Sequence, residues 1–396
     1  MLACTGRLLY RRQIESQGVK LLSTLCDYAA ADMPKIVKGR NRPSRSSDGA
    51  AGGAIDRNSK HGGLRSAASS AGEAARTASS GGGRGMARNL VAPNKSMGQN
   101  FLKNPMIVQG IVERAAVQRT DVVLEIGPGT GNLTVHLLER AKRVIAIELD
   151  TRMVREVMKR FEGTEKEKSL QIIQGDVLKT PLPFFDVLVA NIPYNISSPL
   201  LFKLLAHRPM FRCAVIMFQD EFAQRLTARP GTDMWCRLSV NTQLLAKVDQ
   251  LFKVNRNNFR PPPKVDSRVV RIELRNPPPP VNFTEWDGMI RIIFNRKNKT
   301  LRSTLTTKCS LKFLASNVNT YRAIHPEREG STVSAMQTDA VGEGGGNGRV
   351  TEAEVKEMVE GVLAAESLEG KRAAALDIDD LLALLSAFNE KGIHFT

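Results

Sequence analysis

The 396-residue sequence has little of what metal centres and disulfide frameworks require. Its five cysteines and five histidines lie far apart, with no CxxC pair and no HExxH motif. This spacing indicates a reducing compartment and fits neither a disulfide framework nor a zinc site. We therefore expect no metal in the mechanism.

Long apolar runs are missing as well. No segment approaches the roughly 18 consecutive apolar residues that a membrane-spanning helix requires, so we expect a soluble protein without a membrane partner. Hydrophobic residues still make up 42% of the sequence, which is enough to build a core. The length allows two modest domains with additional tails.

Acidic residues are scarce toward the N-terminus. Residues 1–95 hold 16 Lys and Arg against 6 Asp and Glu, so they carry +10 of the total net charge of +17. A strongly positive chain favours a polyanionic partner such as RNA, because binding releases condensed counterions. Charge by itself is equally compatible with a role in solubility alone.

The N-terminal region has a low-complexity composition. Residues 43–88 are rich in Ser, Gly, Ala and Arg, and such a segment buries too little apolar surface to offset its ordering entropy. We predict that residues 1–88 form a basic, largely disordered extension. The first 32 residues have the arginines of a mitochondrial presequence, but they also contain acidic residues, which such presequences avoid. Met33 opens a second basic segment, and we favour it over Met1 as the start codon.

Periodic apolar segments begin near residue 97 and alternate between strand-like and helix-like patterns. Continuous apolar strands separated by helices are typical of a parallel sheet covered on both faces. We predict a doubly wound, Rossmann-like α/β domain over residues 89–275. Its expected strands are 122–126, 144–148, 170–173, 186–190 and 213–218, and its expected helices are 105–118, 131–141 and 150–161.

Residues 276–396 are predicted to form a smaller helical C-terminal domain. The proline run at 277–280 can continue neither a helix nor a strand and indicates a rigid hinge. A polar, Gly-rich segment near 322–350 is predicted to be an inserted loop. The final segment, DIDDLLALLSAFNEKGIHF, has the spacing of an amphipathic helix, with Gly392 beyond its end.

A glycine-rich loop follows the first predicted strand of this domain. In VVLEIGPGTGNLT, Gly127, Gly129 and Gly131 stand between a buried strand and a helix, where glycine allows a tight turn and lets a ligand approach the helix N-terminus. The GxGxG spacing differs from the GxGxxG of pyrophosphate-binding loops, although a dinucleotide loop or a plain structural turn stays possible. The carboxylate of Glu125 beside the loop favours a cationic ligand, such as a sulfonium amino acid, over a diphosphate.

Two further acids follow predicted strands. Glu148 ends the second strand, where a carboxylate can bind both ribose hydroxyls of an adenosyl group. NAD enzymes use the same device, so Glu148 does not identify the cofactor, and a solvated strand-end acid is the alternative. Asp176, in QGDVL, stands where it could accept from an adenine amino group, although GD after a strand is more often a turn.

The motif NIPYN, residues 191–195, follows the apolar strand DVLVA. Open α/β sheets place their sites at the carboxyl ends of strands. The side-chain oxygen of Asn191 and a backbone carbonyl held by Pro193 can accept both N–H groups of a planar amine such as adenine N6. Tyr194 can stack on the base. The motif therefore predicts methylation of an amino group, the alternative being a capped strand-to-helix turn.

A second aromatic residue, Phe259, precedes three prolines in NNFRPPPKVDS. The prolines fix the backbone, so the ring could be held against the opposite face of the base. Stacking is worth roughly 1–3 kcal/mol per base. A core Phe before a proline turn is an equally good interpretation of this residue alone.

Taken together, these segments resemble the ribosomal-RNA adenine dimethyltransferase family, and specifically its eukaryotic small-subunit branch. The resemblance runs from about residue 89 to 396, apart from the predicted insert. The matching motifs are GQNFL (98–102), EIGPGTGNLT (125–134), IELD (147–150), GDVL (175–178), NIPYNISSPL (191–200), MFQDEFAQRL (217–226), FRPPPKVDS (259–267), NPPPPVNFTEWDG (276–288) and FNRKNKTL (294–301).

The resemblance implies a Rossmann-like S-adenosylmethionine-dependent methyltransferase domain followed by a small helical domain. The implied substrate is a pair of adjacent adenosines in the 3′-terminal hairpin of 18S rRNA, each of which receives two methyl groups. We expect a monomer that acts on the pre-ribosomal particle in the nucleus or nucleolus. The implied cofactor-binding residues are Gln99, Asn100, Leu102, Gly127, Gly129, Glu148, Asp176, Val177 and Asn191, and the implied catalytic residues are Asn191, Ile192, Pro193, Tyr194 and Phe259.

Other functions are weighed against this one. A dinucleotide oxidoreductase would share the glycine loop and Glu148, but it leaves NIPY and FRPPPK unexplained. A ribosome-assembly factor whose methylation is dispensable would use the same basic surfaces, and the sequence does not exclude it. The eukaryote-like C-terminal tail disfavours a mitochondrial paralogue or a large-subunit rRNA enzyme. Asp220 departs from the family pattern, and we expect it to alter an RNA-facing charge.

Overall fold

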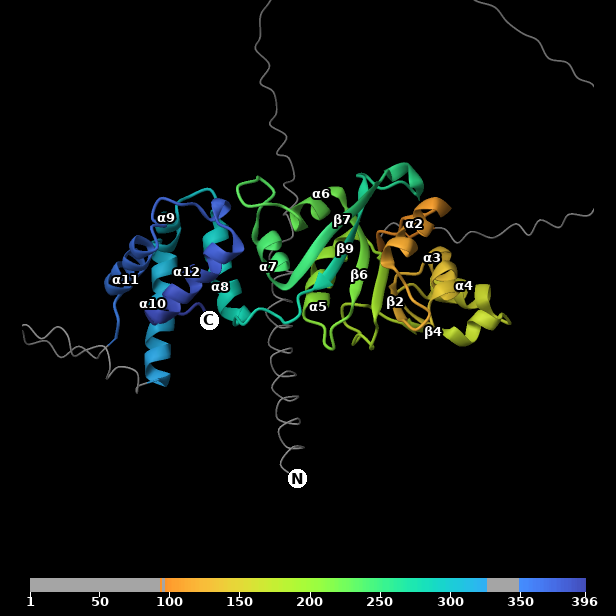
Figure 1. Cartoon of the computed structure of the whole chain (residues 1–396), viewed down its shortest axis with the longest axis horizontal. Coiled ribbons are helices and arrows are strands. Elements are labelled where there is room, and N and C mark those ends of the chain that lie inside the picture. The colour runs from red at the N-terminus through yellow and green to blue at the C-terminus, as the bar shows by residue number, and fades with distance from the viewer. Residues whose placement is uncertain (1–92, 95–96, 326–348) are drawn as a thin grey trace, which may run out of the picture. The chain divides into compact units, whose positions relative to one another are not determined.

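The computed structural model describes residues 93–94, 97–325 and 349–396, all of which fall in one compact unit. The predicted disorder of residues 1–88 and most of the predicted insert lie outside this part of the chain. The predicted α/β class is confirmed, because a seven-stranded sheet forms the centre of the N-terminal half (Figure 1). The elements on both sides of residue 276 belong to the same unit, so the domain boundary there stays an interpretation.

The sheet has the strand order β4-β3-β2-β5-β6-β9-β7. The first five strands in this order are parallel, and their bounds are Leu170–Gln174 (β4), Arg143–Glu148 (β3), Val122–Ile126 (β2), Val187–Asn191 (β5) and Cys213–Gln219 (β6). Each lies within two residues of the predicted strand. Alternate residues of β2 belong to two separate apolar clusters, Leu124 and Ile126 to one and Val123 to the other. Both faces of the sheet are therefore buried, as a continuous apolar strand pattern predicts.

The prediction of a wholly parallel sheet is wrong at one edge. Strands Ala246–Val254 (β7) and Ser267–Leu274 (β9) pair antiparallel with each other, and β9 pairs antiparallel with β6. Because the chain reverses in the connection over residues 255–266 and the two strands are antiparallel neighbours, they form a hairpin. Half-exposed and exposed residues interrupt the apolar pattern of β7, which is why a search for continuous apolar runs missed it.

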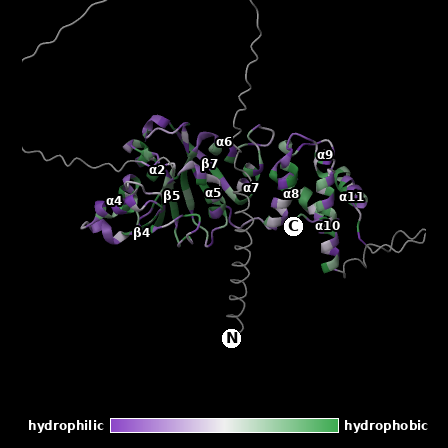
Figure 2. Cartoon of the chain, turned by 180° about the vertical axis from the view of Figure 1, so that it is seen from behind, coloured by the Kyte–Doolittle hydropathy of each residue, from purple (hydrophilic) through white to green (hydrophobic). Residues whose placement is uncertain are grey.

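Helices cover the sheet, and side-chain caps fix where several of them begin. The Asn104 side chain accepts from the Met106 N–H, and the Asp150 side chain accepts from the Arg152 N–H, so the helices start one residue later in each case. Figure 2 shows the contrast between the hydrophobic strand β5 and the hydrophilic outer face of α4. The bounds are Pro105–Ala115 (α2), Asn132–Arg140 (α3), Thr151–Phe161 (α4), Ser197–Leu205 (α5), Asp220–Leu226 (α6) and Arg237–Leu245 (α7).

The named secondary-structure elements after residue 282 are all helices in the described part of the chain. Helix α10 continues to Ile324, so the predicted start of the insert at residue 322 is wrong by three residues. Capping boxes begin α11 at Thr351 and α12 at Asp377. Gly392 has a positive φ of 73° beyond the end of α12, as the sequence predicts. The bounds are Phe283–Asn295 (α8), Leu301–Leu305 (α9), Lys308–Ile324 (α10), Glu352–Ala365 (α11) and Ile378–Glu390 (α12).

A buried polar network joins α7 to α8. The carboxylate of Asp287 is fully buried and accepts from Arg237 Nη2 at 3.0 and 2.9 Å and from Asn241 Nδ2 at 2.7 Å. Trp286 Nε1 donates to Asn241 Oδ1 at 2.9 Å. Removing one partner of a buried charge pair costs about 3–5 kcal/mol, so this network fixes how the two helices pack.

Candidate active site

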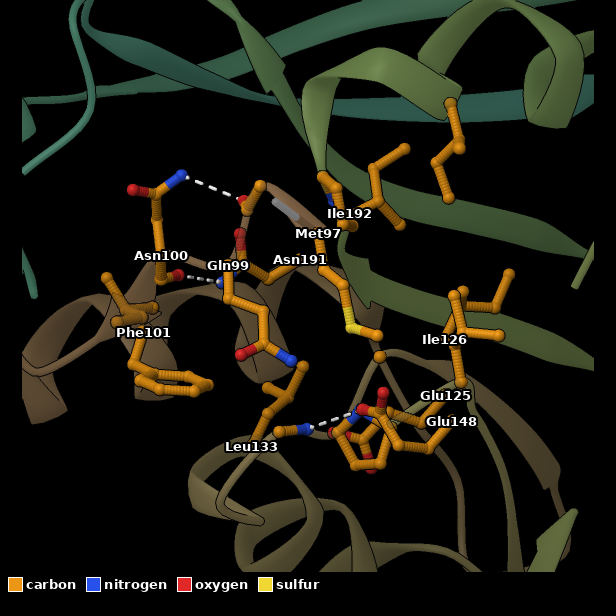
Figure 3. A pocket seen from close by; sticks show the side chains of 18 of the residues that line it. Met97, Gln99, Asn100, Phe101, Glu125, Ile126, Leu133, Glu148, Asn191 and Ile192 are labelled. Carbon is orange, nitrogen blue, oxygen red and sulfur yellow. Dashed lines mark hydrogen bonds between the residues drawn. The ribbon is translucent and has the colours of Figure 1, made fainter. Parts of the chain in front are cut away.

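A pocket of about 300 Å³ opens at the carboxyl ends of β2, β3 and β5. It is lined by every residue that the sequence predicted for the site, from GQNFL through NIPY to Phe259. Figure 3 shows that these side chains come from opposite sides of one cavity, with Glu125 and Glu148 on one side and Asn100 and Asn191 on the other. The sheet therefore brings together segments that are far apart in the sequence, which is the condition for a shared site.

The glycine loop has the backbone conformation that glycine permits. Gly127 and Gly129 have φ values of 68° and 57°, in the left-handed region. A Cβ atom on Gly129 would lie 3.2 Å from the ring of Phe101, which also lines the pocket. A side chain at this position would be strained and crowded, so the loop keeps the pocket open beside the N-terminus of α3.

Glu148 connects the glycine loop to the end of β3. Its two carboxylate oxygens accept from the Gly129 N–H at 3.2 Å and from the Asp150 N–H at 2.9 Å. Only 7% of the residue is exposed, and this burial raises the pKa of the carboxyl group. The backbone donors hold the carboxylate at the pocket wall, and each of its oxygens has a second lone pair for a ligand. Its predicted contact with ribose stays a prediction.

Glu125 is the second carboxylate of the pocket. It is 1% exposed, and neither side-chain oxygen makes a hydrogen bond of ordinary geometry among the described residues, although the nearby Thr134 hydroxyl lowers the pKa of the carboxyl group somewhat. Burial raises the pKa of Glu125 to about 8. A buried acid without a donor is costly unless a ligand supplies one. With this pKa the group is mostly protonated at neutral pH in the free protein, and a ligand that carries an amino group or another positive charge would stabilise its ionised form, whereas a diphosphate would not.

The amide of Asn191 is oriented by the segment on the opposite side of the pocket. Its Nδ2 atom donates to the Asn100 carbonyl at 3.4 Å (Figure 3). A carbonyl can only accept, so the amide nitrogen faces Asn100 and Oδ1 is left as an acceptor. The Pro193 carbonyl already accepts from the Ile196 N–H at 3.3 Å, whereas no turn or loop N–H of the described chain donates to the Ile192 carbonyl, so both of its lone pairs are available to the acceptor amine.

The two predicted aromatic residues differ in exposure. The Tyr194 hydroxyl is 2.6 Å from Ser267 Oγ, which fixes the ring at the pocket wall. Phe259 is only 2% exposed and belongs to a core cluster, since β8 (Phe259–Arg260) pairs with β1 (Phe101–Leu102). Phe259 therefore has a packing role in the structure. Its predicted stacking on the target base stays a prediction.

Lys203, which the sequence analysis did not single out, holds the loop that carries Asp176. The Nζ atom of Lys203, on α5, donates to the carbonyls of Val177 at 2.7 Å, Leu178 at 3.0 Å and Thr180 at 2.7 Å. Asp176 Oδ1 accepts from the Leu178 N–H at 2.9 Å, which is the turn that the sequence offered as the alternative. Asp176 and Val177 nevertheless line the pocket. No sequence signal marks Lys203, because its contacts are with the backbone.

Gln99 lines the pocket, but both ends of its amide are used within the protein. Oε1 accepts from the Asn94 N–H at 2.8 Å, and Nε2 donates to Asp150 Oδ2 at 2.9 Å. The Arg152 side chain and the Gln99 amide, which both donate to Asp150, lower the pKa of that carboxyl to about 2. Gln99 therefore fastens the segment before β1 to the end of β3. Leu149, half exposed at the pocket, was missed because apolar residues at strand ends are common.

Asp220 lies outside the pocket. Its Oδ1 atom is 2.6 Å from Arg268 Nε, and its Oδ2 atom is 3.5 Å from Lys253 Nζ. Asp220 is therefore paired with basic residues on the neighbouring strands, and its expected departure from the family pattern stays a prediction. In the described part of the chain no group of three potential metal ligands occurs, and no helix is long and apolar enough to cross a membrane.

A mixed seven-stranded sheet with a glycine loop, acidic residues at strand ends and an NIPY motif at one pocket defines a Rossmann-like methyltransferase. The chain belongs to the ribosomal RNA adenine dimethylase family, which matches residues 91–338. The resemblance inferred from the motifs, and the class of enzyme that it implies, an rRNA adenine methyltransferase, are thereby confirmed.

Named relatives agree with this membership. Over 302 residues the chain is 54% identical to a "Probable dimethyladenosine transferase" of Drosophila melanogaster, covering 76% of this chain and 92% of the relative. It is 52% identical over 326 residues to a "Ribosomal RNA small subunit methyltransferase" of Arabidopsis thaliana, with 76% and 92% covered. The crystal structure of a dimethyladenosine transferase from Plasmodium falciparum matches with a TM-score of 0.65 and 43% identity, covering 75% of this chain and all of that one.

Proposed function

We propose that this protein transfers methyl groups from S-adenosylmethionine to N6 of two adjacent adenosines in the 3′-terminal hairpin of small-subunit rRNA, giving N6,N6-dimethyladenosine. It acts as a monomer on the pre-ribosomal particle in the nucleus or nucleolus. Family membership and the names of the eukaryotic relatives support the reaction and the small-subunit substrate. The observation that carries the proposal is the Asn191 amide, turned by Asn100 so that its oxygen can accept from an amine.

The residues of the pocket fit an adenosyl sulfonium cofactor. Glu125 would hold the amino group of its methionine part, since its carboxyl group is buried and makes no hydrogen bond of ordinary geometry in the part of the chain that the structure describes. Glu148 would accept from the ribose hydroxyls, and Asp176 from the adenine amino group. When bound, S-adenosylmethionine supplies an electrophilic methyl group on a positively charged sulfur.

The opposite wall prepares the acceptor nitrogen. Adenine N6 is a weak nucleophile, because its lone pair is conjugated with the ring. Asn191 Oδ1 and the Ile192 carbonyl would accept its two N–H groups and direct the lone pair toward the methyl carbon, while Tyr194 stacks on the base. N6 gains a bond to carbon as the sulfur–carbon bond breaks, and its surplus proton then leaves to water. Positioning of this kind can supply several kcal/mol.

The assay combines purified full-length protein, labelled S-adenosylmethionine and small subunits that lack the modification, followed by nucleoside mass spectrometry. Dimethyladenosine is expected with the wild type. The Asn191→Ala variant should yield none, with its cofactor affinity weakened only moderately. Asn298→Ala, an exposed asparagine outside the pocket, is the matched control and should behave as wild type. Undiminished turnover by Asn191→Ala would refute the assigned role.

A further inference from the structure

A second cavity, of about 620 Å³, lies where α6 and α7 meet α8, α9 and α10. We call it the arginine pocket. Basic and hydroxyl side chains dominate its wall, and neither Asp nor Glu lines it. Its lining residues are Arg225, Cys236, Arg237, Arg291, Ile292, Phe294, Asn295, Arg296, Thr304, Thr307 and Ser310.

Two arginines of the arginine pocket share a single carboxylate. Asp287, fully buried behind the wall, accepts from Arg237 Nη2 at 2.9 Å and from Arg291 Nη2 at 3.1 Å. One carboxylate is thus shared by two guanidinium groups. The Arg291 side chain is still 56% exposed, and Arg296 is exposed at the rim. Guanidinium groups present planar pairs of N–H donors that match a phosphate group.

Helix geometry adds to this charge. Thr307 caps α10, a helix of 17 residues, and Ser310 lies in its first turn. No acidic residue occurs in that turn, so nothing there offsets the positive end of the helix dipole. Both hydroxyl residues line the same cavity as the four arginines, but they bond each other at 2.7 Å, and Ser310 Oγ donates to the Thr304 carbonyl at 3.1 Å. The donors that an anion could use are therefore the exposed guanidinium groups, with the helix dipole adding to their charge.

We propose that the arginine pocket binds a backbone phosphate of the RNA substrate, at a distance from the methylated bases, and so anchors the strand. The inference rests on the proposed function only in taking RNA as the partner. Because Arg291 and Arg296 are exposed at the rim, a phosphate can be bound while it stays part of a longer strand. An enclosed site would favour a free anion.

The test measures affinity for a labelled 3′-terminal small-subunit rRNA hairpin between 50 and 200 mM salt, using the full chain. Arg291→Gln/Arg296→Gln should bind about tenfold more weakly, and the slope of log affinity against log salt should become shallower by about 1 per lost contact. Arg119→Gln/Arg155→Gln removes the same charge from exposed positions outside the pocket and should keep the wild-type slope. Affinity for S-adenosylmethionine checks that each variant is folded.

Arg296→Gln alone keeps the proposal testable if loss of Arg291 weakens the α7–α8 network. Among the described residues the Arg296 side chain makes no hydrogen bond or ion pair, and only its backbone carbonyl is bonded, accepting from the Lys299 N–H at 2.8 Å. An unchanged affinity and slope in both variants would overturn the proposal. So would tight binding of inorganic phosphate, abolished by the same substitutions, together with unaltered RNA binding, which would make the ligand a free anion. If the wild type methylates RNA while the arginine-pocket variants keep the wild-type salt slope, only this inference fails. If the salt slope of these variants is shallower than that of the wild type but the wild type forms no dimethyladenosine, only the proposed reaction fails.

Discussion

The two walls of the active-site pocket use opposite chemistry. The wall built by β2 and β3 carries two buried carboxylates, Glu125 and Glu148. The wall built by β5 and the segment before β1 is uncharged and offers an amide and backbone carbonyls from Asn191, Ile192 and Asn100. A carboxylate wall attracts a cation, whereas a neutral acceptor wall can orient an amine without protonating it. We infer that different residues bind the cofactor and orient the nucleophile, so substitutions should affect one task without the other. Each prediction below tests this.

The largest effect is expected on the neutral wall. Asn191→Ala removes an acceptor that acts on the nucleophile, so kcat should fall by about 100-fold or more, as for loss of one preorganised hydrogen bond in a catalytic site. The dissociation constant of S-adenosylmethionine should change by only a few-fold. Single-turnover kinetics with separately measured cofactor binding provide the check. A large loss of affinity with normal kcat would place Asn191 on the cofactor side.

The next effect is expected on the carboxylate wall. Glu125→Gln removes the charge that would meet the cofactor amino group, so the cofactor dissociation constant should rise by about tenfold. The free protein should become more stable, because a buried acid without a partner is removed. Calorimetric titration and thermal unfolding measure both quantities, with the half-buried Glu156→Gln as control. Weaker binding accompanied by lower stability would contradict this reasoning.

The raised pKa of Glu125 predicts that the stability difference between the wild type and Glu125→Gln depends on pH. Its folded value of about 8 exceeds the ordinary 4.5, so the folded state binds more protons between these two values. The contribution of Glu125 to the free energy of unfolding of the cofactor-free protein should therefore decrease as pH rises from about 4.5 to 8. Melting temperatures of wild type and Glu125→Gln across this range should converge toward low pH and separate toward high pH. Parallel curves would contradict the assignment.

A smaller effect is expected at Lys203, which supports the Asp176 loop of the active-site pocket. Lys203→Met removes the ammonium that holds three carbonyls of the Asp176 loop, so KM for the cofactor should rise several-fold with kcat nearly unchanged. Lys203→Arg should restore part of the loss. Arg208→Met removes a cation that donates to the Leu205 and His207 carbonyls, next to the end of the same helix, and serves as control. Equal effects of the two Met variants would indicate general destabilisation.

The smallest effect should come from the Tyr194 hydroxyl. Tyr194→Phe loses the bond to Ser267 but keeps the ring, so activity should fall only a few-fold. Tyr194→Ala removes the stacking surface and should raise KM for RNA by about tenfold or more, in line with the roughly 1–3 kcal/mol of base stacking. Steady-state kinetics with varied RNA distinguish the two. Similar losses in both variants would shift the role from the ring to the hydroxyl.

Sequence patterns predicted the parallel part of the sheet and the pocket, because both depend on local signals. Continuous apolar strands such as 122–126 and the glycine loop are confined to a few residues, and strand ends in such sheets converge on one edge. The antiparallel edge was not predictable in this way. Strand β7 has an interrupted apolar pattern, and its pairing with β9 depends on the chain reversing within the segment that carries Phe259.

The supporting contacts of the site were equally hidden from the sequence. Lys203 acts on backbone carbonyls, which any sequence supplies, and Gln99 turned out to be tied to Asp150. The burial of Phe259 follows from its pairing opposite Leu102, a contact between residues more than 150 positions apart. Such contacts depend on the folded arrangement, so only a structure reveals them.

We propose that both walls together dimethylate adjacent adenosines of small-subunit rRNA. The most direct measurement treats unmodified small subunits with the purified protein and S-adenosylmethionine, digests the rRNA and sequences the fragments by mass spectrometry. We expect two neighbouring N6,N6-dimethyladenosines in the 3′-terminal hairpin, and neither of them with Asn191→Ala. Methylation at another site, or no product while cofactor and RNA both bind, would contradict it.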